Sequence, residues 1–326
     1  MDRIKRAFWT AALLAVAAVP AAAQKFPDGK PIEMTVMFGA GSAADVTARQ
    51  LADGMAKQLG APVPVVNRTG GGGALGYVHV SQQKPDGYSI VWNSNSISTT
   101  YHAGTLSFDY TTFEPVARVT VENPALAVKT DSPFKTLKDL VDYAKANPGK
   151  VRIGNSGAGS HTHIAAEALF ALPGAKITSV PFNGGQALVN LLGGRIEAIV
   201  QFPAAVAPHV KSGDLRVIAM LGSMRDPIFP NVPTAREQGY DVALDMWRGI
   251  AVPKGTPKPV ILALQNAIEK TVQSPEFKEA GVNIGFTPAF LPSAEFGKMI
   301  ANDDVRLAAI MDKIGMNKKR TDAAGQ

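Results

Sequence analysis

Apolar and polar residues follow one another along this chain in blocks that predict strands followed by helices. The first block is the clearest, because residues 34–38 are strand formers and a glycine-rich turn follows at residues 39–42. From there to Leu59 the apolar residues recur at helical spacing, and Gly60 and Pro62 end the predicted helix. A glycine turn before a helix exposes backbone N–H groups at the positive end of the helix dipole. Such a turn is suited to binding an anion.

The same order of elements returns several times later in the chain. We expect further strands at residues 63–66, 88–92, 151–153, 177–180, 196–200, 215–220 and 249–252. We expect further helices at residues 74–82, 136–147, 161–172, 259–272 and 293–314. Because strands alternate with helices, the pattern predicts an α/β protein with mainly parallel sheets flanked by helices.

Two candidate crossings between lobes lie near residues 121–124 and 245–247. They predict two lobes joined by two strands, with the second lobe inserted into the first. The first lobe would comprise residues 24–122 and 248–326, and the second would comprise residues 123–247. Ligands of open α/β sheets bind outside the carboxyl ends of the strands, so we expect a site in the cleft between the lobes.

The N-terminus predicts export. Basic residues precede an apolar run at residues 7–19, and small residues at Ala21 and Ala23 place a cleavage site before Gln24. Residues 1–23 are therefore expected to be a secretory signal peptide, and the mature protein is expected to be periplasmic. A retained membrane anchor is the weaker interpretation, because the run is shorter than the ~20 residues of a membrane span.

Composition and charge narrow the function classes. The 326 residues are 46% hydrophobic and 18% charged, which is an ordinary globular composition. The chain has no cysteine, which excludes disulfides and thiolate metal sites and suits a bacterial periplasmic protein. The formal charge of +6 is scattered and lacks an aromatic-rich basic stripe. Nucleic acid is therefore not an expected partner, whereas a small anionic ligand is compatible with the charge.

Residues 39–44 formally fit the dinucleotide pattern GxGxxA. The next strand, however, ends at Asn67 and Arg68 rather than at an acidic residue for a ribose, and an exported protein is separated from the nucleotide pool. A turn with no ligand is the second alternative. We interpret the turn as an anion site, with Asp45 organising the loop through backbone N–H groups. Residues 71–76 also fit GxGxxG, and we interpret them as a structural turn.

A second loop, at residues 154–162, sets hydroxyl groups and N–H groups at another predicted helix start and is typical of a carboxylate cradle. A serine hydrolase is the competing class, but Ala158 stands where the pattern GxSxG would require glycine after Ser156. His161 and His163 diverge by roughly 200° on a helix and cannot chelate one metal there. We therefore predict no metal, no cofactor and no catalytic residue.

Several segments together resemble the Bug family, the periplasmic solute-binding proteins of the tripartite tricarboxylate transporter system. The matching segments span nearly all of the predicted mature chain: the first loop with Asp45, Ala48 and Arg49, and residues 66–73, 85–88, 157–161, 180–185, 191–194, 247–249 and 253–257. The resemblance implies a two-lobed binding protein of type II-like fold, with two crossover strands at the hinge. Such a protein closes on a small carboxylate and delivers it to a membrane permease of the tripartite tricarboxylate type.

The family's first loop usually carries prolines before a glycine pair, whereas this chain has Gly39, Ala40, Gly41 and Ser42, so Ser42 adds a donor. In the family, this loop and the serine-rich loop of the other lobe grip a carboxylate. They correspond here to residues 38–45 and 156–162.

The candidate site therefore draws on loops of both lobes. The expected donors to one carboxylate are the N–H groups of Gly41 and Ser42, together with Ser156, Ser160 and Thr162. The side chains expected to pack against the apolar body of the ligand are Phe38, Phe182 and Trp247. Those expected at its far end are Ser94, Asn95, Asn183 and Gln201. The same loops add Asp45, Gly159, His161 and Gly184. Neutral donors suffice, because several charge-assisted hydrogen bonds can replace the hydration of a carboxylate.

These patterns predict an exported, non-enzymatic receptor for an aromatic or aliphatic mono- or dicarboxylate. A ligand-binding partner of a membrane sensor would use the same site, and the sequence does not separate the two.

Overall fold

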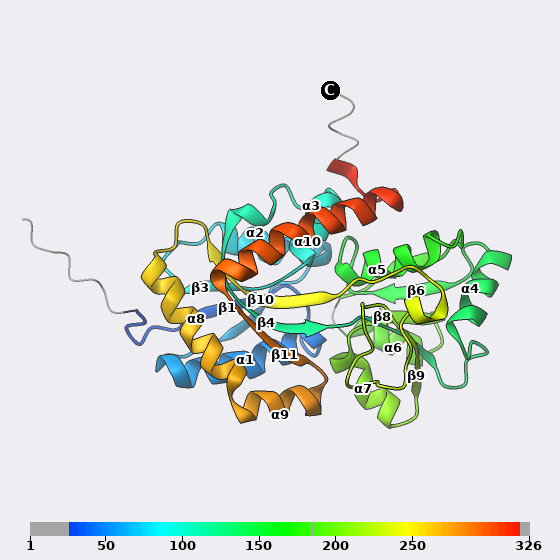
Figure 1. Cartoon of the computed structure of the whole chain (residues 1–326), viewed down its shortest axis with the longest axis horizontal. Coiled ribbons are helices and arrows are strands. Elements are labelled where there is room, and N and C mark those ends of the chain that lie inside the picture. Colours follow the sequence, from blue (N-terminus) through cyan, green and yellow to red (C-terminus); the bar gives the residue numbers. More distant parts are fainter. Residues whose placement is uncertain (1–25, 184, 320–326) are drawn as a thin grey trace, which may run out of the picture.

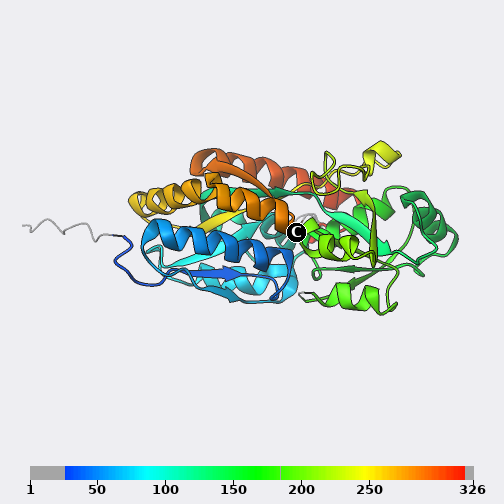
Figure 2. The same ribbon diagram turned by 90° about the horizontal axis from the view of Figure 1, so that it is seen from below.

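The computed structural model describes residues 26–183 and 185–319, and these residues form two lobes, each built on its own sheet (Figure 1). The lobes lie side by side along the long axis of the molecule (Figure 2). The predicted two-lobed α/β fold is thus confirmed. The expected signal peptide, residues 1–23, lies outside the described residues.

The first sheet has six strands in the order β11-β4-β10-β3-β1-β2. Its strands are β1 (Glu33–Val36), β2 (Val65–Asn67), β3 (Ser89–Ser94), β4 (Phe113–Glu122), β10 (Met246–Pro253) and β11 (Thr287–Pro292). The second sheet has five strands in the order β7-β6-β8-β5-β9. Its strands are β5 (Ala125–Lys129), β6 (Arg152–Asn155), β7 (Thr178–Pro181), β8 (Ala198–Gln201) and β9 (Leu215–Met220).

Helices flank both sheets. Those of the first lobe are α1 (Ala43–Leu59), α2 (Ala74–Ser81), α3 (Ser96–His102), α8 (Lys258–Gln273), α9 (Pro275–Ile284) and α10 (Ser293–Lys313). Those of the second lobe are α4 (Leu137–Ala146), α5 (His161–Ala171), α6 (Gln186–Leu192) and α7 (Pro203–Lys211). Over residues 26–183 and 185–319, no helix is both long enough and apolar enough to cross a bilayer.

Strand pairing corrects one part of the predicted fold, because both sheets are mixed rather than mainly parallel. Strand β1 is parallel to β2 and β3, and β6 is parallel to β7 and β8. Strand β10, however, is antiparallel to β3 and β4, and β5 is antiparallel to β8 and β9. The connection between the lobes accounts for the β4–β10 pair, because β4 leads the chain into the second lobe and β10 brings it back, so these two strands run in opposite directions.

Helix α1 forms where the hydrophobic pattern predicts it. Ser42 caps its first turn, and Gly60 ends it at φ 63°, a left-handed conformation that favours glycine. Ala48, Leu51 and Met55 are fully buried on the face that packs into the core of the first lobe. The helix is therefore fixed along its length, and its N-terminus is held at a defined position at the edge of the lobe.

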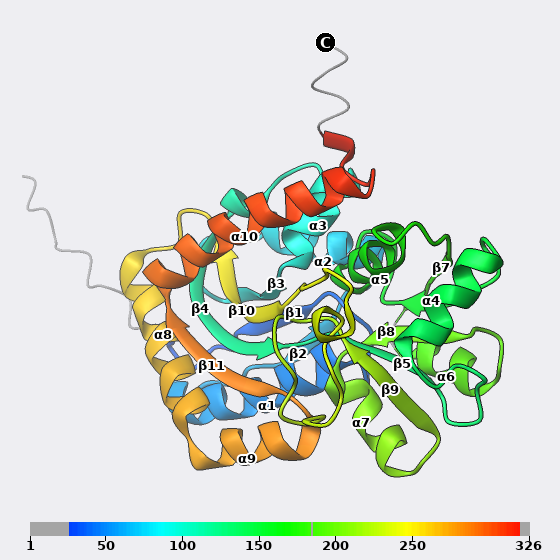
Figure 3. The same ribbon diagram turned by 45° about the vertical axis from the view of Figure 1, so that its right-hand side comes forward.

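Within the described part of the chain, three segments connect the lobes. The chain crosses between β4 and β5 through Asn123 and Pro124, and it returns just before Met246, where crossings were expected. Helix α10 is the third connection, because Phe296 packs in the core of the first lobe and Leu307 packs in the core of the second. Figure 3 shows α10 lying across the first lobe with its C-terminal end towards α5, which it contacts.

Candidate ligand-binding site

Helix α1 presents two backbone donors at the junction of the lobes. The Ser42 hydroxyl accepts from the Asp45 N–H at 3.3 Å, and the first intrahelical bond runs from the Val46 N–H to the Ser42 carbonyl at 3.0 Å. Among the described residues, no group accepts from the N–H groups of Ala43 and Ala44. These two donors lie at the positive end of a 17-residue helix.

Helix α5 repeats this arrangement on the second lobe. The Ser160 hydroxyl accepts from the His163 N–H at 3.3 Å, and the Ile164 N–H donates to the Ser160 carbonyl at 3.1 Å. The N–H groups of His161 and Thr162 have no acceptor in the described part of the chain. Each lobe thus supplies a serine-capped helix start with two unpaired donors.

Both helix starts border one small cavity of about 20 Å³. That volume holds about one water-sized group, because one water molecule requires roughly 10–15 Å³. The residues that line it are Phe38, Ser42, Ala43, Ala44, Ser96, Ser156, Ser160, His161, Thr162, Gln201, Phe202, Met246 and Arg248. No acidic side chain is among these residues, so the cavity favours an anion.

The first loop is held by Asp45, whose predicted role as an organiser of the loop is confirmed. Its carboxylate accepts from the Gly41 N–H at 3.0 Å, from Arg49 at 2.9 and 3.2 Å and from Asn67 at 2.8 Å. Burial by itself would raise the pKa of Asp45, but these hydrogen bonds outweigh it and hold the pKa below its ordinary value of 3.8. Asp45 therefore stays ionised and fixes the loop.

The Asp45 contacts also correct the predicted donors. The Gly41 N–H is used by Asp45, and the Ser42 N–H donates to the Gly39 carbonyl at 3.1 Å. Neither N–H is free for a ligand. Because Ser42 is the cap residue, the unpaired donors lie one and two residues further on, at Ala43 and Ala44.

Arg248 is the charged residue of the cavity lining. Its Nε donates to Glu122 Oε1 at 2.8 Å, and its guanidinium lies 4.9 Å from the ring centroid of Phe202. The side chains of Arg248 and Glu122 are only 2% and 1% exposed. Glu122 therefore neutralises Arg248. The guanidinium group borders the cavity, but the ion pair adds no net charge to it.

Two buried polar atoms at the cavity have no partner in the described residues, Ser96 Oγ and His161 Nδ1. His161 Nε2 lies 3.0 Å from the Leu244 carbonyl, which can only accept, so this nitrogen carries the proton. Burial lowers the pKa of His161 below 6.5. The neutral imidazole thus keeps an unpaired acceptor nitrogen, which suits a bound water or a ligand hydroxyl group.

The predicted residues divide into those at the cavity and those elsewhere. Those that line it are Phe38, Ser42, Ser156, Ser160, His161, Thr162 and Gln201. Gly41, Asp45 and Gly159 lie in the two loops without lining it; the Gly159 N–H donates to His163 Nδ1 at 3.0 Å. Gly184 lies outside the described residues.

The structure places the remaining predicted residues away from this cavity. Trp247 donates from Nε1 to Asp303 at 2.8 Å, and Asn95 donates to Asp303 at 2.9 Å, so both support the hinge. Ser94 accepts from the Ser96 N–H at 3.3 Å within the β3–α3 turn. Phe182 packs beside the core of the second lobe, and Asn183 is exposed. None of these five residues lines the cavity, and their predicted contact with a ligand stays a prediction.

Sequence reasoning missed other lining residues: Ala43, Ala44, Ser96, Phe202, Met246 and Arg248. One signal was present for the first two. A serine three residues before Asp45 is typical of a helix cap, and it places the free N–H groups immediately after the serine. Arg248 interrupts an otherwise apolar strand, which is a signal for a paired buried charge.

The lobes are closed on one another around the cavity. A Cβ atom on Gly72 of the first lobe would lie 2.3 Å from the Ala158 carbonyl oxygen of the second lobe. Ala43, Phe202 and Met246 form a small apolar cluster between the lobes. The sequence pattern predicts only a turn at residues 71–76, and the structure adds that this turn touches the serine-rich loop.

Acidification should loosen the first loop, because the lowered pKa of Asp45 links its charge to stability. A group with a depressed folded-state pKa stabilises the protein above its unfolded pKa of about 4 and loses that contribution as the pH falls further. In thermal melts between pH 6 and pH 3, Asp45→Asn should therefore lose less stability than the parent protein. An equal loss in both proteins would contradict this assignment.

Comparison with known proteins gives the same fold and adds a family. A family model described as "Tripartite tricarboxylate transporter family receptor" (TctC) matches residues 47–316. Protein BugT of Bordetella pertussis is 33% identical over 308 residues, which cover 93% of this chain and 94% of BugT. The structure of the periplasmic binding protein BugD aligns with a TM-score of 0.84 at 28% identity, covering 90% of this chain and 99% of that one.

MatC from Rhodopseudomonas palustris, solved with bound malate, aligns with a TM-score of 0.80 at 26% identity and covers 87% of this chain and 99% of MatC. Both the strands and the lobe arrangement of this chain therefore follow those of periplasmic binding proteins. The match of the family model over most of the sequence decides the assignment: this chain belongs to the TctC family of tripartite tricarboxylate transporter receptors, which includes the Bug proteins.

Proposed function

We propose that this protein is an exported, non-enzymatic receptor that captures a small organic carboxylate between its lobes and delivers it to a membrane permease of the tripartite tricarboxylate type. The ligand class is an aromatic or aliphatic mono- or dicarboxylate. The signal peptide expected at residues 1–23 and the periplasmic location stated for BugD support export. The bound malate of MatC supports a carboxylate ligand.

One observation carries this proposal: helix starts from opposite lobes direct four unpaired N–H groups to one cavity without an acidic lining residue. Two helix dipoles and four donors can replace the water around a carboxylate without a free cation. A ligand held by both lobes favours the closed arrangement, because its contacts are complete only there. Entry requires the lobes to separate, since the closed cavity is so small.

The hydrolase alternative gains no support from the geometry. The Ser156 hydroxyl lies 3.4 Å from Gln201 Oε1, and the Ser160 hydroxyl lies 3.2 Å from that of Thr162. In the described residues, neither serine is hydrogen-bonded to a histidine ring, which an activated nucleophile would need.

The partner of a membrane sensor would bind the same ligands. Uptake of the ligand that is abolished by a permease knockout separates a transport role from that sensory role.

A thermal-shift screen tests the function. Malate, adipate, citrate and benzoate should be compared with the corresponding amides, which keep the shape and lose the charge. A carboxylate ligand at ~100 times its Kd should add about 2.7 kcal/mol to the free energy of unfolding. If none of a wide panel of carboxylates shifts the melting temperature, the proposed ligand class is wrong.

Ser160→Ala should weaken binding of the carboxylate found in that screen by roughly 2- to 10-fold, because it removes one hydroxyl group from the cavity. It should also lower stability by about 1 kcal/mol through loss of the helix cap. Ser274→Ala is the matched control, since Ser274 caps α9 through the Phe277 N–H and does not line the cavity. Calorimetry that shows equal affinities for the two variants would remove Ser160 from the site.

A further inference from the structure

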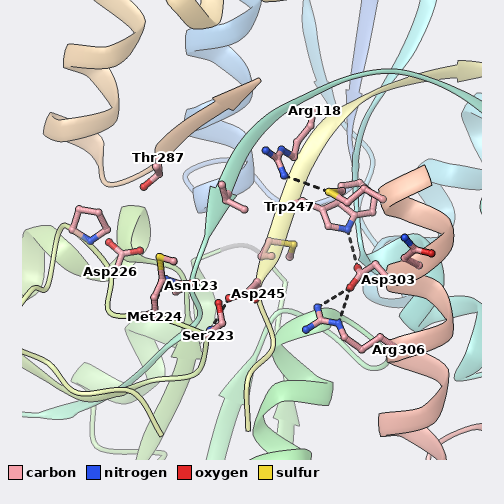
Figure 4. A pocket seen from close by; sticks show the side chains of 15 residues that line it. Arg118, Asn123, Ser223, Met224, Asp226, Asp245, Trp247, Thr287, Asp303 and Arg306 are labelled. Atoms are coloured by element: carbon pink, nitrogen blue, oxygen red, sulfur yellow. Dashed lines mark hydrogen bonds and ion pairs between the residues drawn. The ribbon is translucent and has the colours of Figure 1, made fainter. Parts of the chain in front are cut away.

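A second and larger cavity of about 460 Å³ lies beside the strands that connect the lobes (Figure 4). The first lobe contributes β4, β10, β11 and α10 to its walls, and the second lobe contributes the loop after β9. Met246 borders both this cavity and the smaller one. The volume of the larger cavity lies within the range of about 300–1,000 Å³ that is usual for binding sites of small molecules. We call it the hinge cavity.

The first-lobe wall of the hinge cavity carries a guanidinium group without a counter-charge. Arg118 of β4 is half-buried, and it donates from Nε to the Ala289 carbonyl at 2.8 Å and from Nη1 to Met299 Sδ at 3.4 Å. No carboxylate of the described residues lies within ion-pair distance of it. The Nη2 group is therefore left to face the cavity or solvent, without an acceptor among the described residues (Figure 4).

The second-lobe wall carries a carboxylate without a counter-charge. Asp226 is only 4% exposed and accepts from the Ile228 N–H at 2.9 Å. Within the described residues, no lysine or arginine lies at ion-pair distance from it. Burial raises the pKa of Asp226, as does the nearby charge of Glu122. A buried carboxylate in this position lacks the cation that normally compensates it.

The other charged groups of the cavity already have partners. Arg306 pairs with Asp303 at 2.7 Å, and Asp245 accepts from the Ser223 N–H at 2.7 Å. The apolar side chains among the lining residues include Val121, Met224, Met246, Trp247 and Met299. Methionine side chains adapt to the shape of an apolar group. The unmatched charges therefore stand at two walls of a chamber that suits an aliphatic chain.

We propose that the hinge cavity binds a small zwitterion of the amino acid class, with its carboxylate at Arg118, its ammonium group at Asp226 and its aliphatic chain against the methionines. The Nη2 group of Arg118 can donate a charge-assisted hydrogen bond to the carboxylate, and Asp226 gains the cation that it lacks. This site is separate from the carboxylate site between the helix starts, and it does not depend on the identity of that ligand.

Calorimetry with 4-aminobutyrate, 5-aminopentanoate and 6-aminohexanoate tests the proposal. At least one of these zwitterions should bind. Pentanoate and pentylamine each keep only one of the two charges, so they should bind at least about tenfold more weakly. Arg118→Met and Asp226→Asn should each weaken binding about tenfold or more. Asp226→Asn keeps the oxygen that accepts from Ile228, so it remains informative if Arg118→Met does not fold. Arg195→Met, which removes an exposed arginine elsewhere, is the control and should bind normally.

Three results would overturn the proposal: no binding of any member of the series, binding that survives Asp226→Asn unchanged, or binding that is lost in Ser160→Ala. The last result would place the zwitterion between the helix starts. Failure of the carboxylate screen leaves this test intact, because the two cavities are probed with different ligands and different variants.

Discussion

Glu122→Gln should lower the free energy of unfolding by about 3–5 kcal/mol, which is the cost of leaving one partner of a buried ion pair without its counter-charge. The change keeps the size of the side chain but leaves the Arg248 guanidinium, 2% exposed, without compensation. Urea unfolding measures the difference. A carboxylate ligand should stabilise this variant more than it stabilises the parent protein, because Arg248 lines the cavity and would then carry a net charge.

The exposed pair Arg152 and Glu197 supplies the control. These side chains are 46% and 24% exposed, so Glu197→Gln should cost no more than about 1 kcal/mol. If Glu122→Gln lowered the free energy of unfolding as little as Glu197→Gln, then Arg248 and Glu122 would not form the buried ion pair that the structure describes. An unchanged ligand effect in Glu122→Gln would instead show that Arg248 does not reach the ligand.

Gly72→Ala should reduce carboxylate affinity by about 1–3 kcal/mol, or roughly 5- to 150-fold, by opposing closure of the lobes. The added Cβ would lie 2.3 Å from the Ala158 carbonyl oxygen and 2.9 Å from the Ser160 nitrogen, both on the other lobe. The two groups separate when the cleft opens, so the conflict exists only in the closed arrangement. Calorimetry measures the affinity, and small-angle scattering with ligand measures the closure.

Gly71→Ala is the matched control. Gly71 and Gly72 have φ values of 57° and 67°, so alanine pays a similar backbone cost at either position. The neighbours of a Cβ on Gly71 are Thr105 and Ala74, both of the first lobe. Gly71→Ala should therefore lose stability without a matching loss of affinity. Equal affinity losses in the two variants would assign the effect to the turn itself.

Much of the fold could be predicted from the sequence, because amphipathic segments such as α1 and α4 carry periodic apolar faces and clear caps. Helix α3 was missed: its residues Ser96–His102 are rich in serine and β-branched threonine, and only burial in the first lobe makes this segment helical. The antiparallel pairing of β4 with β10 depends on the path of the chain between lobes, which a local pattern does not contain.

The two loops that border the candidate cavity could be predicted from the sequence, but the particular donor groups and several of the lining side chains could not. Successive side chains of a strand face opposite sides, so Trp247 cannot share the side of its neighbours Met246 and Arg248. The structure places Arg248 at the small cavity and Trp247 at the hinge cavity, whereas Met246 borders both. The partnership of Arg248 with Glu122 joins residues 126 positions apart, and no short-range pattern contains it.

Helix α10 is anchored at Phe296 in one core and at Leu307 in the other, with Asp303 between them holding Asn95 and Trp247. A helix that packs in both cores restricts how the two lobes can move relative to one another. The lobes cannot rotate freely about β4 and β10, because a wide separation would remove Leu307 from the core of the second lobe. We therefore expect the lobes to separate over a limited range, because α10 is packed against both cores.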